Sequence, residues 1–328
     1  MNNLNNTSQM EQNETVDNSL KIVEEMEDVF TKEDLDFFEE NGYVILHNAI
    51  TEEQRLATVA AIWNFLGMDG NNPKDWYRPP AVRNGFVELY HHQTFWDNRC
   101  SPRIYKAFSQ LFGTKDLWVS IDRGCMKVPV VPNDSYWNHK GFVHWDLDPW
   151  ADEYPFQLQA VLCLEDTDEN QGGFHCVPGM HKYLKQWSKQ VKPPKAAREK
   201  YYRDRFPINV PESAMKKLRV QKVPGKAGDL IIWRRELAHG NGENLSNRPR
   251  LAQYINMYPA TDRYYETRIL GTQESLHPEP LHQRIEMWRY SLTPFHKPGD
   301  SRMIQKEQTP AVLNDVGKRL LGLERWTD

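Results

Sequence analysis

The chain has 328 residues, of which 41 are Lys or Arg and 45 are Asp or Glu, and its formal net charge is −4. Because the basic residues are scattered and not gathered into one stripe, the composition argues against nucleic acid or an anionic membrane surface as the main partner. No apolar run approaches the ~20 residues that span a bilayer, and the first residues do not resemble a signal peptide, so we expect a cytoplasmic protein without membrane insertion.

The N-terminal segment is rich in Asn, Gln, Glu, Ser and Thr and poor in large apolar side chains. Such a segment cannot offset the entropy that ordering would cost. We therefore predict a disordered polar tail over residues 1–25 and a single folded domain over residues 26–328.

Helix signals follow the tail. A capping box at Thr31 and a glycine at Gly42 predict the start and stop of a short helix. Residues 43–50 then read as a strand, and a second capping box at Thr51 opens an amphipathic helix that reaches Met68.

Beyond about residue 115 the pattern changes to short apolar runs separated by turn residues. Helices of 10 to 15 residues do not alternate with these runs, which favours a sandwich or barrel over a parallel sheet. We predict a mainly β fold with flanking α-helices: a β core over about residues 115–260, N-terminal helices packed on it, and a C-terminal extension over residues 261–328. The expected strands fall within 117–130, 141–148, 156–164, 172–179, 228–237 and 250–260.

A basic, polar insertion occupies residues 181–205. The simplest interpretation is a solvated loop or a surface helix, and the alternative is a lid over a substrate. The sequence leaves its role open.

Residues 141–150, GFVHWDLDPW, carry the first candidate metal ligands. His144 and Asp146 would point to the same face of a strand, ~7 Å apart along the backbone, and could converge on one ion. Asp148 has the same parity, but the proline after it forces it into an extended conformation and out of the strand.

A third ligand is needed for a strong site, and His239 offers it near the end of a later expected strand. Two His and one carboxylate on one face of a metal leave other positions open, as in non-haem Fe(II) oxygenases. On residue spacing alone, a hydrogen-bonded, half-buried His144 with no metal remains an equal alternative.

Two arginines, Arg248 and Arg250, follow the distal histidine. An arginine aimed inward suits the far carboxylate of a small dicarboxylic acid, whereas a surface turn is the alternative for either residue. Because Pro249 cannot donate to a β-ladder, the strand is expected to start at Arg250.

These residues together resemble the phytanoyl-CoA dioxygenase family. The resemblance rests on HWD at 144–146, His239, Arg250 eleven positions later, and the segments GGFHCVPGMH, GDLIIW and FFEENGYVIL. It implies a double-stranded β-helix (jelly-roll, cupin-like) that binds one Fe(II) through His144, Asp146 and His239. It also implies 2-oxoglutarate as a co-substrate, which chelates the iron at one end and places its distal carboxylate on Arg250 at the other. The oxidant that the resemblance implies is O2.

Further positions are candidates for co-substrate contacts. Asn241 falls where the family often has a small hydroxyl residue, and its amide could donate to the same carboxylate. Lys127 and Arg123 share one strand face, and either could meet the co-substrate or a charged substrate. Trp233 shares the parity of His239 and is a candidate for the pocket wall.

The carboxylate at Asp146 favours hydroxylation over halogenation, because family members that halogenate carry a small residue there. The resemblance therefore implies a dioxygenase that hydroxylates a small or medium organic molecule, such as a natural product, lipid or metabolite, with release of succinate and CO2. Two alternatives stay open: the same chemistry on a CoA- or carrier-linked acyl group, and a non-catalytic metal-binding jelly-roll sensor. The sequence leaves the substrate and the oligomeric state unknown.

Overall fold

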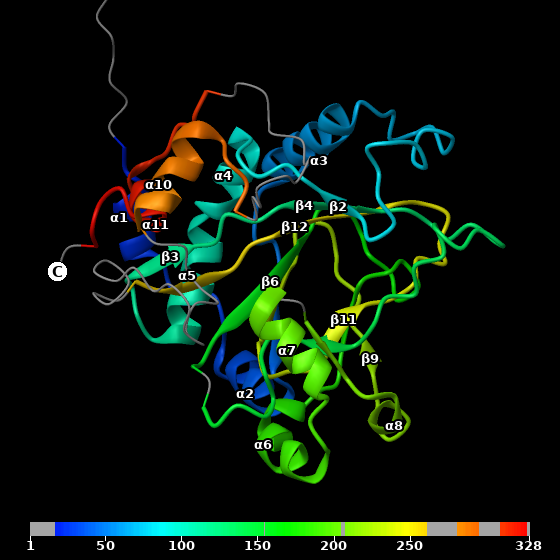
Figure 1. Ribbon diagram of the computed structural model, residues 1–328. Helices are drawn as coiled ribbons and strands as arrows, with labels where there is room; N and C mark the ends of the chain where they lie inside the picture. Colours follow the sequence, from blue (N-terminus) through cyan, green and yellow to red (C-terminus); the bar gives the residue numbers. More distant parts are fainter. Residues whose placement is uncertain (1–16, 154, 205–206, 261–280, 295–308, 327–328) are drawn as a thin grey trace, which may run out of the picture.

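The computed structural model describes residues 17–153, 155–204, 207–260, 281–294 and 309–326 (Figure 1). Two antiparallel sheets form its centre. The larger sheet has the order β1 (Tyr43–Leu46), β10 (Leu230–Arg234), β6 (Leu158–Cys163), β12 (Arg250–Tyr254), β4 (Gly124–Lys127), β2 (Phe86–Val87). The smaller sheet has the order β8 (Ile208–Asn209), β5 (His144–Trp145), β11 (His239–Asn241), β7 (Phe174–Cys176), β9 (Gln221–Lys222), and β13 (Met257–Pro259) pairs separately with β3 (Leu117–Val119).

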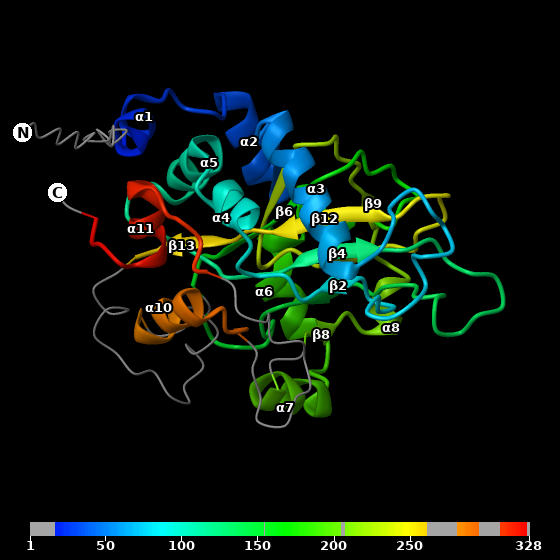
Figure 2. The ribbon, with the colours of Figure 1, turned by 90° about the horizontal axis from the view of Figure 1, so that it is seen from above.

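This architecture confirms the predicted mainly β fold with a jelly-roll core. All pairings within the sheets are antiparallel, as expected for runs joined without crossover helices. Helices α3 (Glu52–Leu66), α4 (Gln93–Arg99) and α5 (Pro102–Phe112) lie on one side of the larger sheet (Figure 2).

Alternation along the strands separates two apolar clusters. In β6, Leu158, Ala160 and Leu162 belong to the cluster beneath these helices, whereas Val161 and Cys163 belong to the cluster between the two sheets. Because strand side chains alternate with a period of two, Gln159 also faces the space between the sheets. That space holds the candidate site.

The predicted helix boundaries follow the capping signals. Thr31 and Thr51 each form a complete capping box, at the starts of α2 (Lys32–Asn41) and α3. Gly42 ends α2 with φ +81°, a left-handed conformation that glycine adopts without steric cost.

The prediction of disorder over residues 1–25 is wrong for the last residues of that range. Ser19–Glu25 form α1, whose Val23 is buried, and α1 contacts α5 and α11 (Asp315–Leu321). Burial of apolar side chains against distant helices offsets the ordering entropy that the local composition cannot offset. Residues 1–16 lie outside the described residues, and the assignment of residues 26–328 to one domain stays a prediction.

The basic insertion is helical and packed. It forms α6 (Met180–Gln190) and α7 (Lys195–Asp204), and the ring of Trp187 lies 5.0 Å from that of Trp145 and 5.8 Å from that of Trp150. The insertion therefore rests on the outer side of the strand that carries His144. The structure also describes the four-residue helix α8 (Glu212–Met215) and the ten-residue helix α10 (Leu281–Tyr290).

None of the described helices combines the length and the apolar character that crossing a bilayer would require.

Candidate metal centre

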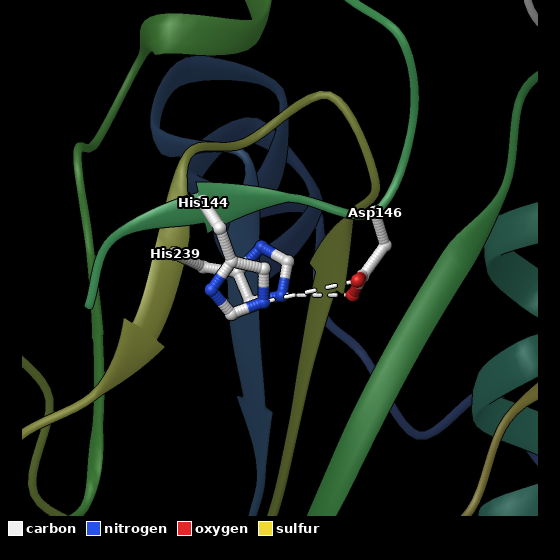
Figure 3. A group of neighbouring side chains, drawn as sticks. All are labelled: His144, Asp146 and His239. Carbon is white, nitrogen blue, oxygen red and sulfur yellow. Dashed lines mark ion pairs between the residues drawn. The ribbon is translucent and has the colours of Figure 1, made fainter. Parts of the chain in front are cut away.

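Strand pairing brings the two histidines together. β5 and β11 run antiparallel, with His239 directly opposite His144, and the two imidazole ring centroids lie 4.6 Å apart. The pairing register therefore joins two segments that are far apart in sequence. Figure 3 shows both rings turned toward Asp146.

Asp146 reaches the histidines from a bend. The expected strand over residues 141–148 is shorter than predicted, because β5 ends at Trp145 and the chain turns immediately after it. Asp146 Oδ1 lies 3.8 Å from His144 Nε2, and Oδ2 lies 3.4 Å from His239 Nε2. All three ligand atoms lie within 4.8 Å of one another, and no second such group of His, Cys, Asp or Glu occurs in the part of the chain that the structure describes.

Hydrogen bonds orient both imidazoles. His239 Nδ1 lies 2.9 Å from the main-chain oxygen of Leu237, and His144 Nδ1 lies 3.3 Å from that of Phe142. Because a carbonyl oxygen only accepts, each Nδ1 carries the proton and donates. The Nε2 lone pairs then face Asp146, as in metal sites whose histidines are held from behind.

The electrostatics of the group match those of metal ligands. Burial lowers the pKa of His144 to about 4, and the attraction of Asp146 does not offset this shift. Burial by itself would raise the pKa of Asp146, but the electrostatic effect of His144 and His239 and the hydrogen bond from Gln159 outweigh it and lower that pKa. At neutral pH the site therefore offers a neutral His144 imidazole and a carboxylate, the protonation states that metal binding requires.

Three residues that the sequence did not reveal hold Asp146 in place. Gln159 Nε2 donates to Asp146 Oδ2 at 2.8 Å. Arg235 donates to the main-chain oxygen of Asp146, and the Tyr201 hydroxyl donates to the same oxygen at 3.4 Å. They come from β6, the segment before β11 and α7, and no local motif links them to the HxD segment.

Arg250 lies in the interior and Arg248 on the surface. The Arg250 side chain is 1% exposed, and its Nη1 donates to Asn241 Oδ1 at 3.3 Å. Among the described residues, its Nε and Nη2 have no hydrogen-bond partner. This donor set fits a carboxylate, whereas the half-exposed Arg248 pairs with Asp168 at 3.5 Å.

Asn241 and Lys127 flank Arg250. The side-chain oxygen of Asn241 accepts from Arg250, so Asn241 positions the guanidinium in addition to the amide role that we expected. Lys127 lies opposite Arg250 in the β4–β12 register, is buried and donates to the main-chain oxygen of Gly242. Burial lowers its pKa to about 8. Arg123 instead pairs with Glu88 at 2.9 Å.

The remaining candidates are placed as follows. The ring centroid of Trp233 lies 5.1 Å from that of His239, so Trp233 packs beside one of the candidate metal ligands. Asp148 lies outside the cluster, as expected: its buried carboxylate accepts from Arg198 Nε at 2.8 Å and from the Tyr202 hydroxyl at 2.5 Å.

Comparisons with known proteins agree with this geometry. The family model described as phytanoyl-CoA dioxygenase (PhyH) matches residues 38–252. A Dictyostelium discoideum protein with a provisional phytanoyl-CoA dioxygenase name is 25% identical over 301 residues, covering 76% of this chain and 84% of its own. The hypothetical protein JW0805 of Escherichia coli superposes with a TM-score of 0.65 at 17% identity, covering 89% of this chain and 82% of its own. The epimerase SnoN, in complex with Fe3+, α-ketoglutarate and nogalamycin RO, superposes with a TM-score of 0.50 at 18% identity, covering 70% of this chain and 84% of its own.

Proposed function

Because this chain belongs to the phytanoyl-CoA dioxygenase family, we propose that it is an Fe(II)- and 2-oxoglutarate-dependent dioxygenase that hydroxylates a small or medium organic molecule. Succinate and CO2 would be the co-products. The observation that carries the proposal is the coexistence of a preorganised His–Asp–His group with a buried, incompletely paired Arg250. Iron, when bound, supplies the activation of O2 that C–H oxidation requires.

Nε2 of His144, Nε2 of His239 and a carboxylate oxygen of Asp146 would hold the metal. Such a set of three ligands would suit an iron that must also bind a co-substrate and O2. The bond from Gln159 occupies one lone pair of Asp146 Oδ2 and limits rotation of the carboxylate.

The co-substrate is proposed to lie between the sheets, with its far carboxylate on Arg250. Nε and Nη2 of Arg250 supply two donors, and the neighbouring Lys127 adds positive charge when protonated. Trp233 and Phe174, whose ring centroids lie 4.4 Å apart, wall the metal side of this space and exclude water from it. We propose that Asn241 acts through Arg250.

Hydroxylation is proposed because Asp146 supplies a carboxylate where halogenating family members carry a small residue. A free small molecule is preferred over a CoA- or carrier-linked group because basic side chains of the insertion are already engaged. Arg198 pairs with Asp148, and Lys182 pairs with Glu40. A cytoplasmic location stays a prediction.

The test is an anaerobic titration of the metal-free protein with Fe(II) and then 2-oxoglutarate, followed by visible absorption. We expect the weak charge-transfer band of the iron–2-oxoglutarate chelate in the wild-type protein and its loss in His239→Ala. His47→Ala, a change at an exposed histidine, is the control and should keep the band. A well-folded wild-type protein without the band would refute the proposal and favour the sensor.

A further inference from the structure

A cavity lies beside Gln159 and Arg235, two residues whose side chains donate to Asp146. It is partly open to solvent, and about 290 Å³ of empty space lies within its walls when the open part is included. Its walls come from β6, from the segment that follows β10, and from the β12–β13 segment. The lining residues among those described are Gln157, Leu158, Gln159, Arg235, Asn256, Met257 and Tyr258.

Arg235 brings a buried positive charge to this cavity. Its side chain is 5% exposed, and it donates to two neutral acceptors, the main-chain oxygen of Asp146 and Gln157 Oε1. Within the described residues, its Nε has no hydrogen-bond partner and no carboxylate forms an ion pair with it. A buried guanidinium without a counter-charge is unfavourable, so an anionic ligand group would stabilise it.

The preceding residue shows the contrast. Arg234 pairs with Glu39 at 3.5 Å and with Glu236 at 3.4 Å. Its guanidinium carbon lies 4.7 Å from the centre of the Phe156 ring. The charge of Arg234 is therefore already compensated, which makes it the matched control for Arg235.

Gln159 adds an acceptor to the same cavity. Its Nε2 donates to Asp146 Oδ2, which fixes the orientation of the amide, and its buried Oε1 has no partner among the described residues. A buried acceptor without a hydrogen bond is energetically unfavourable, so a ligand that donates to it would gain binding free energy. Both lining residues also contact Asp146, so a ligand held by them would lie beside the metal ligands.

We propose that Arg235 and Gln159 form the substrate-binding subsite, and that the substrate is a small organic acid with a hydroxyl or amino group. The carboxylate of the acid accepts from Arg235 Nε, and its hydroxyl or N–H donates to Gln159 Oε1. This inference rests on the proposed function and narrows its substrate class. It assigns separate roles to two buried arginines: Arg250 binds the co-substrate and Arg235 binds the substrate.

The test observes the arginine Nε–H signals by NMR in the full-length protein loaded with Zn(II), which is redox-inert. The signals are assigned by their absence in Arg235→Lys, Arg234→Lys and Arg250→Lys. After saturation with 2-oxoglutarate, 3-hydroxybutyrate is added as the probe acid, and 3-hydroxybutyramide serves as its uncharged match. We expect the acid to shift the Arg235 signal with at least tenfold higher affinity than the amide, and to leave the Arg234 signal unchanged.

A second measurement needs no variant. Ligand-observed saturation transfer on the wild-type protein should show tighter binding of 3-hydroxybutyrate than of butyrate, because only the former can donate to Gln159. Equal binding of these two acids, or an unchanged Arg235 signal, would overturn the subsite.

The NMR experiment distinguishes failure of the proposed function from failure of the substrate subsite. If 2-oxoglutarate does not shift the Arg250 signal, the proposed function is contradicted. If 2-oxoglutarate shifts Arg250 but the acid leaves Arg235 unchanged, only the substrate subsite is wrong. If 2-oxoglutarate shifts Arg235 and not Arg250, both arginine assignments are wrong.

Discussion

Replacing Arg250 by Met is expected to weaken 2-oxoglutarate binding without destabilising the ligand-free protein. The substitution removes the charge-assisted hydrogen bond to Asn241, which contributes about 1.5–3 kcal/mol, and a weaker contact to the Cys125 sulfur at 3.8 Å. It also removes the two donors that lack partners among the described residues, each of which costs about 1–3 kcal/mol when buried. At the middle of these ranges, the free energy of unfolding of the ligand-free protein rises by roughly 2 kcal/mol.

Binding should change in the opposite direction. Two charge-assisted bonds to a carboxylate contribute about 3–6 kcal/mol, so the Kd for 2-oxoglutarate should rise about 100-fold or more in Arg250→Met. Urea unfolding of the metal-free protein measures the first effect, and calorimetric titration of the Zn(II) protein measures the second. Arg248→Met is the control and should change neither, because Arg248 lies on the surface. Normal 2-oxoglutarate binding in Arg250→Met, or a loss of stability above about 3 kcal/mol, would refute the reasoning.

Three further predictions concern buried polar side chains. Burial lowers the pKa of His91 from 6.5 to about 4. Between these pH values the unfolded chain binds a proton that the folded chain does not, so the free energy of unfolding decreases as the pH is lowered. Between pH 7 and pH 5, His91→Gln should therefore lose about 2 kcal/mol less stability than the wild type in urea unfolding. Gln159→Leu removes the bond to Asp146 and should weaken Fe(II) binding about 10- to 100-fold in a chelator competition. Arg198→Ala leaves the buried Asp148 carboxylate without its ion pair and should lower the free energy of unfolding by about 2–3 kcal/mol in the same urea assay.

Each change has its own control and its own contrary outcome. Parallel pH profiles of wild type and His91→Gln would show that His91 does not carry the effect. Gln157→Leu removes a cavity-lining amide that does not contact the Asp146 carboxylate, and an equal loss of iron affinity there would remove the special role of Gln159. Lys195→Ala breaks an exposed pair with Glu199 and should be nearly neutral; if Arg198→Ala is equally neutral, the buried ion pair contributes nothing.

Local rules in the sequence determined the helix ends and the choice of candidate ligands. Thr31 and Thr51 cap their helices through bonds to residues three positions away, and Gly42 needs only its own backbone freedom. These interactions act within one turn, so a single sequence displays them completely. The pairing of a histidine and a carboxylate at 144 and 146 is local in the same sense, although the carboxylate reaches the site from a bend and not from a strand.

Tertiary structure decided everything that depends on pairing register and burial. Residue spacing by itself does not place His239 opposite His144, and it left a surface turn open for both Arg248 and Arg250 until the family resemblance favoured Arg250. Nor does it show that Arg235 lacks a counter-charge within the described residues while Arg234 has two. The reason is physical: these outcomes depend on which distant segments pack together, and a side chain's partners across a sheet are not encoded by its sequence neighbours. Order in α1 has the same origin, because this helix, whose Val23 is buried, contacts α5 and α11, which the chain supplies far downstream.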